Sequence, residues 1–251
     1  MEDDTRIGGP EGRFPVTRWT VIEGVQSDDP GERERALGTL AATYWKPVYK
    51  HVRVHWRRSN EDAKDITQDF FTRLIEKRYL DSYDSSKSRL RTFLRTCVDR
   101  HVQNADRDER RLKRGGDLSR LDIDFVGVEE ELARKGLGAE ASPEELFEQE
   151  TIRSLFGLAV DDLKKECEAR GKTVHFQVFE AYDLADREDD RGPTYGDLAA
   201  DHALAVTDVT NYLAWARREF RRLVIERLRE MTGSDDEFRR EARSILGVET
   251  G

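Results

Sequence analysis

The stretch from Leu90 to Arg111 reads LRTFLRTCVDRHVQNADRDERR, and it decides the fold. Its apolar side chains recur at steps of three and four residues, which is the period of an α-helix that buries one face. The paired glycines Gly115 and Gly116 are a natural stop, so we expect a helix of roughly 40 Å at about 1.5 Å per residue. The expected buried stripe consists of Leu90, Phe93, Leu94, Cys97, Val98, His101, Val102 and Ala105.

The other faces of this expected helix are basic. Arginine grips phosphate through two parallel hydrogen bonds and also stacks on bases. A row of guanidinium groups can therefore follow a phosphate backbone, although a solvated basic face is the alternative. The polar residues on or near these faces are Arg89, Arg95, Arg100, Gln103, Asn104, Arg107, Arg110, Arg111 and Arg114.

Two further helices are expected before it. A first stretch runs from about Glu32 to Arg57, and Pro47 inside it predicts a kink or a break into two helices. Ser59 begins a capping-box pattern, so a second helix should run from Asn60 to about Arg78. With the basic helix, these elements predict a first domain over residues 14–116.

The next segment, residues 117–141, is acidic and contains glycine without a sustained period, which is typical of a mobile linker. Ser142, Pro143 and Glu145 then supply an N-cap, a proline in the first helical position and a returning carboxylate. We therefore expect a second helical domain over residues 142–232.

Few stretches favour strands. Val174–Phe179 could be extended on composition, but a helix continuing through Tyr182 fits its neighbours better. The fold class we expect is all-α, with two small helical domains joined by a short acidic linker. The tail, residues 233–251, predicts either a frayed terminus or a short docking helix that uses Phe238, Ile245 and Leu246.

The formal net charge of −9 argues against nucleic-acid binding only if the charge is spread evenly. It is segregated instead. From Lys87 to Arg120 there are 11 Lys and Arg against 5 Asp and Glu, whereas from Leu121 to Glu150 there are 2 against 10. A basic surface can therefore exist within an acidic protein.

Cysteine content and hydropathy set further limits. Cys97 and Cys167 have no CxxC partner, so they predict neither a disulfide framework nor a cysteine-rich zinc site. No apolar run is long enough to cross a membrane, and the first residues lack the order of a signal peptide. We expect a cytoplasmic protein without membrane contact.

Tyr195 to Leu213 reads YGDLAADHALAVTDVTNYL, which fits a helix-turn-helix. Small or apolar residues stand where the helices cross and turn, namely Ala199, Ala203 and Val209. Glycine is usual at the turn because it tolerates a left-handed backbone, so Ala203 is a departure. The expected recognition helix is capped by Thr207, and its candidate DNA contacts are Thr207, Asp208, Thr210, Asn211, Arg217, Arg218 and Arg221, with Arg222 extending the basic tail.

The expected second helix has an acidic face with Asp62, Asp65, Asp69 and Glu76. Such a face can be solvated, can dock on a protein, or can hold magnesium. Phe71 falls toward the acidic edge, where a partner explains an apolar residue better than solvent does.

Other catalytic patterns are weak. His51 and His55 are four residues apart, but the glutamate of the HExxH motif is missing between them. Serine, histidine and aspartate residues are too scattered to nominate a triad. The sequence therefore predicts no enzyme, no metal site and no cofactor.

The residues resemble a known family, the small two-domain sigma factors of bacterial RNA polymerase known as the extracytoplasmic-function type. Residues 61–74, EDAKDITQDFFTRL, are similar to the family's region 2.2, which docks on the clamp helices of the polymerase β′ subunit. The resemblance implies polymerase contacts at Asp65, Gln68, Asp69, Phe71 and Leu74.

Residues 90–111 resemble regions 2.3 and 2.4, which open the promoter and read its minus-ten element. Phe93 stands where the family commonly has tryptophan and Arg100 where it commonly has asparagine, whereas Arg107 agrees. In the preceding loop, Tyr83 and Lys87 could help to capture an unstacked base. The implied promoter contacts are Tyr83, Lys87, Arg89, Phe93, Arg100, Asn104, Arg107, Arg110 and Arg111.

The helix-turn-helix resembles region 4.2, which reads the minus-thirty-five element, and the resemblance spans about residues 14–232. It implies a factor that binds core polymerase, through the β′ clamp helices and the β flap, and directs promoter-specific transcription initiation. Promoter DNA is the second implied partner, and an anti-sigma factor is a third candidate. The rival hypotheses are a helix-turn-helix regulator that acts without polymerase and a carboxylate-metal hydrolase.

Overall fold

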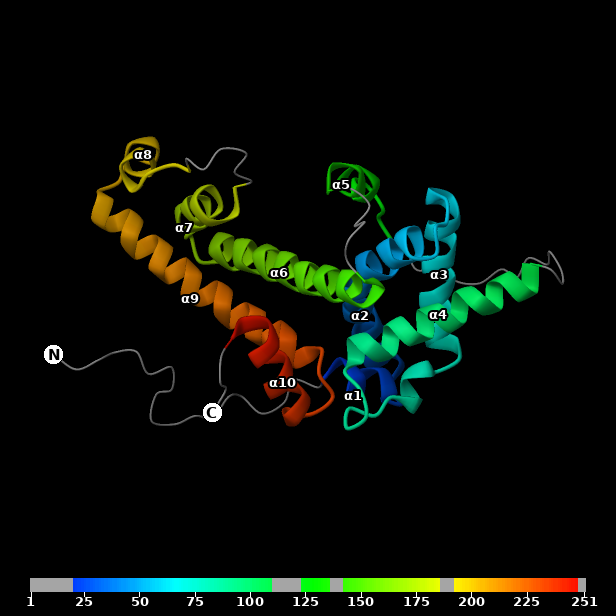
Figure 1. Cartoon of the computed structure of the whole chain (residues 1–251). Coiled ribbons are helices and arrows are strands. Elements are labelled where there is room, and N and C mark those ends of the chain that lie inside the picture. Colours follow the sequence, from blue (N-terminus) through cyan, green and yellow to red (C-terminus); the bar gives the residue numbers. More distant parts are fainter. Residues whose placement is uncertain (1–19, 110–122, 136–141, 186–191, 248–251) are drawn as a thin grey trace.

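The computed structural model describes residues 20–109, 123–135, 142–185 and 192–247. Within these ranges the chain forms ten α-helices and no strand, which confirms the all-α prediction (Figure 1). No helix in the described ranges combines the length and the apolar character needed to cross a membrane.

The first half of the chain is a helical bundle, and its long helices begin where the sequence predicts. The Ser59 side chain caps the third helix by accepting from the Asp62 amide at 3.1 Å. The second helix runs unbroken through Pro47, so of the expected kink or break the break is wrong, because buried Tyr44, Val48 and Tyr49 hold the helix on both sides of the proline. The helices are α1 (Val21–Gln26), α2 (Pro30–Val54), α3 (Asn60–Glu76) and α4 (Leu90–Glu109), with a 3₁₀ turn at Tyr79–Ser82.

The expected mobile linker contains a helix, α5 (Val128–Lys135), so the expectation is wrong for residues 123–135. Val128 and Leu132, one turn apart, are buried in the core of the first half. Glu129 anchors the same helix to α2, because the Arg53 Nε and Nη2 donate to its two carboxylate oxygens at 2.6 and 2.9 Å.

The second half is also helical, and it begins at the capping box predicted for Ser142 and Glu145. Residues 174–179 are helical, as the pattern of the neighbouring residues predicts. The tail forms a docked helix in which Phe238 is buried, which decides between the two expectations for that segment. The helices are α6 (Pro143–Ala169), α7 (Thr173–Phe179), α8 (Tyr195–Asp201), α9 (Val206–Glu230) and α10 (Asp235–Leu246), with a π-turn at Glu180–Leu184.

The two halves are joined by packing as well as by the chain. α6 lies against α2, and α9 runs alongside α6 before the chain turns back into α10 (Figure 1). Phe147 of α6 and Met231 after α9 are both part of the core of the first half. A second core lies among α6, α7, α8, α9 and α10. This packing therefore fixes the position of the second-half helices relative to α4.

A buried lysine fixes this arrangement. The Lys50 Nζ on α2 lies 2.8 Å from the Glu131 Oε1 on α5 and 2.6 Å from the Glu150 Oε2 on α6. The Lys50 side chain is only 2% exposed. Burial lowers the pKa of Lys50, while Glu131 opposes that shift. The two carboxylates thus take the place of the water that burial removes from the ammonium group.

We predict that Lys50→Met destabilises the protein by about 3–5 kcal/mol, because it removes the cation that contacts both the buried Glu150 and the partly exposed Glu131. Urea unfolding followed by circular dichroism measures the change. The matched control is Lys46→Met, one turn earlier on α2 and half-exposed, which should cost less than about 1 kcal/mol. Equal losses in the two variants would contradict a special role for Lys50.

Candidate nucleic-acid interface

The acidic face of α3 is open to solvent at its centre. Asp65 is exposed and Gln68 and Asp69 are half-buried. The Asp69 carboxylate lies 3.3 Å from the His101 Nε2 and 3.0 Å from the Arg73 Nε. His101 and then Arg73 hold the pKa of Asp69 below its usual range, although burial opposes them. Asp65 has no ion pair within the described ranges, so of the two predicted carboxylate contacts, Asp65 and Asp69, it is the one more open to a partner.

Two expected polymerase contacts lie inside the core. Phe71 is 1% exposed and Leu74 is fully buried. The Phe71 ring packs edge-on against Phe70 at 5.2 Å between centroids. The expectation that Phe71 is an exposed apolar residue is wrong, because α3 packs against α2, α4 and the 3₁₀ turn and so buries more than one side. Phe71 and Leu74 therefore stabilise α3 by packing in the core.

The predicted stripe of α4 faces the core, and the opposite face is polar. Leu90, Leu94, Val98 and Val102 are buried, as predicted. Phe93 is half-buried, with its ring 5.3 Å from that of Tyr83. The exposed residues on the outer face include Arg100, Gln103 and Asn104. Arg107 lies on α4, but its side chain falls outside the described residues, as do Arg110 and Arg111 entirely.

The loop before α4 differs from the expectation. Lys87 is exposed, with its Nζ 2.9 Å from the Asp84 Oδ2. Tyr83 is buried instead of offering its ring to a base, and its hydroxyl donates to the Glu237 Oε1 at 2.7 Å. Arg89 is half-buried, and its Nε lies 3.0 Å from the Glu241 Oε1. Glu237 and Glu241 belong to α10, which sequence reasoning placed in an unassigned tail.

The predicted helix-turn-helix is present as α8, a tight turn and α9. Ala203 has φ +53°, the left-handed conformation that the pattern predicts at this position. The turn closes with two backbone hydrogen bonds, from Leu204 to the Ala199 oxygen at 2.8 Å and from Ala203 to the Ala200 oxygen at 3.4 Å. This paired arrangement is the Schellman motif, which satisfies the last carbonyls of a helix. Buried Val209 anchors the following helix.

The cap of the expected recognition helix is different from the prediction. α9 begins one residue before Thr207, and its N-cap is Ala205, whose side chain cannot accept a hydrogen bond. Thr207 is therefore exposed within the first turn and does not cap it. Thr210 and Asn211 are exposed and Asp208 is half-buried, so the start of α9 presents a short polar surface.

The arginines further along α9 are not equivalent. Arg217 is held by Asp183, with Nε and Nη2 donating at 2.9 and 2.8 Å. Arg222 pairs with three glutamates, including Glu166 at 2.8 Å. Arg218 and Arg221 are exposed, with no ion pair in the part of the chain that the structure describes. These two are therefore the most available cations of the basic tail.

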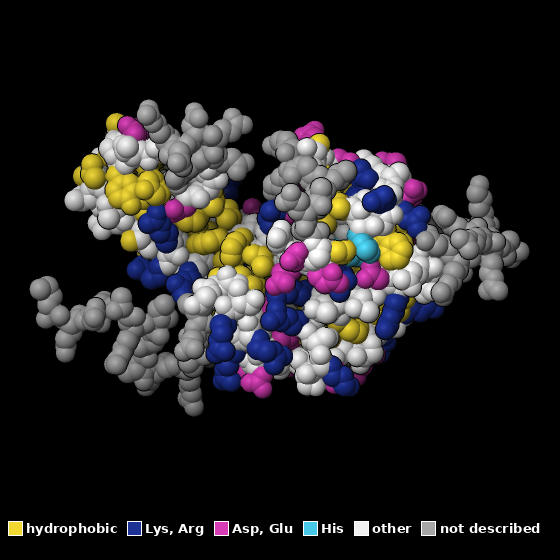
Figure 2. All heavy atoms as spheres, viewed as in Figure 1, with side chains coloured by type: hydrophobic (Ala, Val, Ile, Leu, Met, Phe, Trp, Pro, Cys, Tyr) yellow, Lys and Arg dark blue, Asp and Glu magenta, His cyan; other side chains and the backbone are white. Residues whose placement is uncertain are grey.

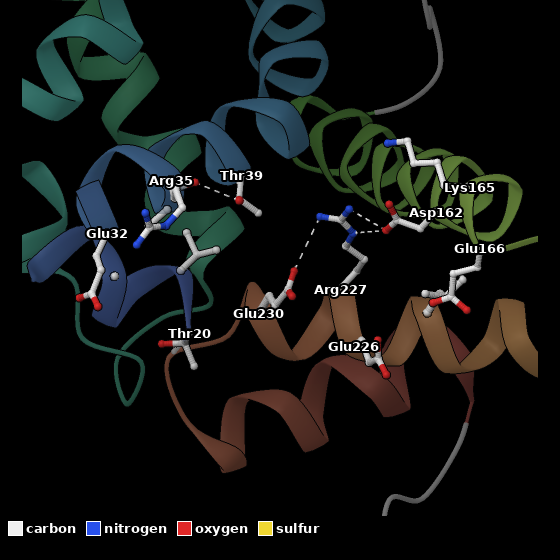
Figure 3. Close-up of a pocket in the computed structure, with 14 residues that line it drawn as sticks. Thr20, Glu32, Arg35, Thr39, Asp162, Lys165, Glu166, Glu226, Arg227 and Glu230 are labelled. Carbon is white, nitrogen blue, oxygen red and sulfur yellow. Dashed lines mark hydrogen bonds and ion pairs between the residues drawn. The ribbon is translucent and has the colours of Figure 1, made fainter. Parts of the chain in front are cut away.

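Charge is distributed unevenly over the visible surface. Figure 2 shows lysine and arginine side chains gathered over α10 and along the edge of α4, beside carboxylates near the start of α6. A groove of about 700 Å³ separates α1 and α2 from α6 and α9 (Figure 3). Some of its polar groups pair with one another, as where Arg227 pairs with Asp162 at 2.6 Å.

The two histidines singled out in the sequence are joined by a third group. His51, His55 and Asp99 have ligand atoms within 4.8 Å of one another. The Asp99 Oδ1 already lies 2.7 Å from the His51 Nε2 and accepts from the Trp56 Nε1 at 2.9 Å. This arrangement favours a hydrogen-bond network that ties α2 to α4. The sequence could not reveal Asp99 as the partner because 48 residues separate it from His51.

Comparison with known families identifies one segment of the chain. Residues 40–112 match the model of the family described as Sigma-70 region 2. The match covers the later part of α2, all of α3 and α4. The match shows that this segment is similar to region 2 of the sigma-70 family. Comparisons with curated proteins and with solved structures gave no match.

We predict that Ala203→Gly stabilises the protein by roughly 1 kcal/mol. A left-handed backbone brings Cβ too close to the following carbonyl oxygen, and glycine removes that strain. Thermal unfolding measures the effect as a rise in Tm. Ala200→Gly, in the last turn of α8, is the control and should lower Tm, because glycine weakens a regular helix. A lower Tm for Ala203→Gly would contradict the claim that the left-handed backbone at Ala203 is strained.

Proposed function

We propose that this chain is a sigma factor of the extracytoplasmic-function type, which binds core RNA polymerase and directs it to specific promoters. One observation carries the proposal. The segment that matches Sigma-70 region 2 ends in α4, which buries its apolar stripe and exposes Arg100, Gln103 and Asn104. A helix held in this way can offer guanidinium and amide groups to DNA along its whole exposed face.

Three surfaces of the protein bind three different parts of the transcription complex. The α3 face around Asp65 binds the clamp helices of the β′ subunit, and the exposed face of α4 binds the minus-ten element and helps to hold its strands apart. The start of α9, with Thr210 and Asn211, reads the minus-thirty-five element in the major groove, while Arg218 and Arg221 contact phosphates. A contact between the second half of the chain and the β flap completes the attachment to polymerase.

Reconstituted transcription with core polymerase is the direct test. We expect the full chain to bind core enzyme and to confer initiation at a defined promoter. A helix-turn-helix regulator that acts alone would bind that promoter tightly without polymerase and would not change the start sites. Failure of the core enzyme to gain promoter specificity would overturn the proposal.

We predict that Asp65→Arg weakens core-polymerase binding at least tenfold, because it places a cation where an exposed carboxylate meets the partner. Fluorescence anisotropy of labelled protein titrated with core enzyme measures the affinity. Glu34→Arg reverses an exposed carboxylate on α2 and is the matched control, expected to stay within twofold. Equal losses for both would point to a non-specific effect of net charge.

We predict that Arg218→Ala and Arg221→Ala each weaken duplex-DNA binding and each reduce the slope of log K against log salt by about 1, because each arginine releases one counterion. Arg217→Ala should change the slope less, since Asp183 already neutralises that guanidinium. Titrations at four salt concentrations measure the slopes. A larger change for Arg217→Ala would reverse the assignment.

A further inference from the structure

Two carboxylates of α10 accept hydrogen bonds from donors at the beginning of α4. Two separate acceptor groups on one face of α10, Glu237 and Glu241, reach across to the other half of the chain. Both glutamates are buried, with 1% and 5% exposure. Buried carboxylates are rare unless they are paired, so this contact is a built feature of the fold.

Glu237 satisfies three donors. Its Oε1 accepts from the Tyr83 hydroxyl at 2.7 Å and from the Leu90 amide at 2.8 Å. Its Oε2 accepts from the Gly233 amide at 2.8 Å. Leu90 is the first residue of α4, where backbone amides lack partners within the helix and favour an anion.

Glu241 lies between two arginines of the segment that precedes and begins α4. Its Oε1 is 3.0 Å from the Arg89 Nε, and its Oε2 accepts from the Arg91 Nη1. Arg91 is 5% exposed and also pairs with Glu148 of α6. The hydroxyl, the amide and the guanidinium groups that meet α10 are the donors that a DNA phosphate would need.

The outer face of α10 differs from the face that meets α4. Arg239 and Arg240 are exposed, and the Arg240 Nη2 donates to the Ser85 oxygen at 3.1 Å. The helix therefore turns Glu237 and Glu241 toward α4, while Arg239 and Arg240 lie on its exposed side. Its position covers Tyr83 and Arg89, two residues that the family resemblance assigns to the promoter.

We propose that α10 is a cover whose carboxylates occupy a phosphate-binding site, formed by Tyr83, Arg89, Arg91 and the Leu90 amide, until a DNA backbone displaces them. The ligand class, a nucleic-acid phosphate, rests on the proposed function. Carboxylate and phosphate compete for the same donors because both accept charge-assisted hydrogen bonds in the same geometry. The free protein thus keeps the promoter-facing end of α4 closed.

The first test loosens the cover in the full chain. Glu237→Gln/Glu241→Gln should tighten binding of a fluorescent single-stranded oligonucleotide at least fivefold, measured by anisotropy without polymerase. Asp235→Asn/Asp236→Asn removes the same charge from exposed positions of α10 and should stay within twofold. Equal tightening in both variants, or none in the first, would overturn the proposal.

A second variant keeps the test decisive if the first one unfolds. A Cβ built on Gly233 lies 3.5 Å from the Ser85 Cβ, within the range that a disulfide spans. It also lies 3.2 Å from the Tyr83 Cε1, so that ring must shift slightly. Ser85→Cys/Gly233→Cys should bind the oligonucleotide at least fivefold more weakly when oxidised than when reduced. Ser85→Cys alone controls for oxidation of the native thiols.

The outcome separates this proposal from the proposed function. Equal binding by the oxidised and reduced forms, or no binding by any variant, would overturn the cover. Transcription with core polymerase is measured in parallel on the unchanged chain. Loss of transcription with the redox response intact would overturn the sigma assignment and leave the competing phosphate site in place.

Discussion

The arrangement of the whole molecule depends on Lys50, a lysine removed from water between Glu131 and Glu150. A buried ammonium group is tolerated only where carboxylates replace its hydration, so α2, α5 and α6 must meet at one point. Once α6 is held against α2, α9 follows along α6, and α10 returns to the beginning of α4. The second half is thereby positioned by a charge requirement as much as by the hydrophobic core.

The same requirement explains how an acidic protein can present a basic surface. Many carboxylates are used internally to neutralise arginines, as Glu129 does for Arg53 and Asp183 does for Arg217. The exposed cations that have no such partner among the described residues, including Arg100 and Arg221, are then the ones that an external anion can reach. Net charge describes the sum over the chain, whereas binding depends on which charges are already compensated.

Packing between the halves also gives the long helices distinct inner and outer faces. α4 rests on the bundle through its apolar stripe, and its first turn is held by groups from α6 and α10. Asn104, farther along its outer face, is exposed among the residues that the structure describes. The two ends of a single helix therefore differ in access, which a uniform helical pattern does not indicate.

Local structure was determined by the sequence itself. Ser59 and Ser142 start helices because their side chains accept hydrogen bonds from backbone amides only three residues away. The stripe from Leu90 to Val102 follows from helical periodicity. The left-handed turn at Ala203 is likewise a short-range property. Such features involve neighbouring residues, so they need no knowledge of the remaining chain.

Only the tertiary structure decided which faces are covered. The burial of Phe71, the docking of α5 through Val128, and the contact between Arg91 and Glu241 depend on helices that are far apart in sequence. Periodicity identifies an apolar face but does not say how many neighbours will pack around it. The sequence determined the helices and their caps, while long-range packing and the pairing of buried charges decided which candidate contacts stay open to a partner.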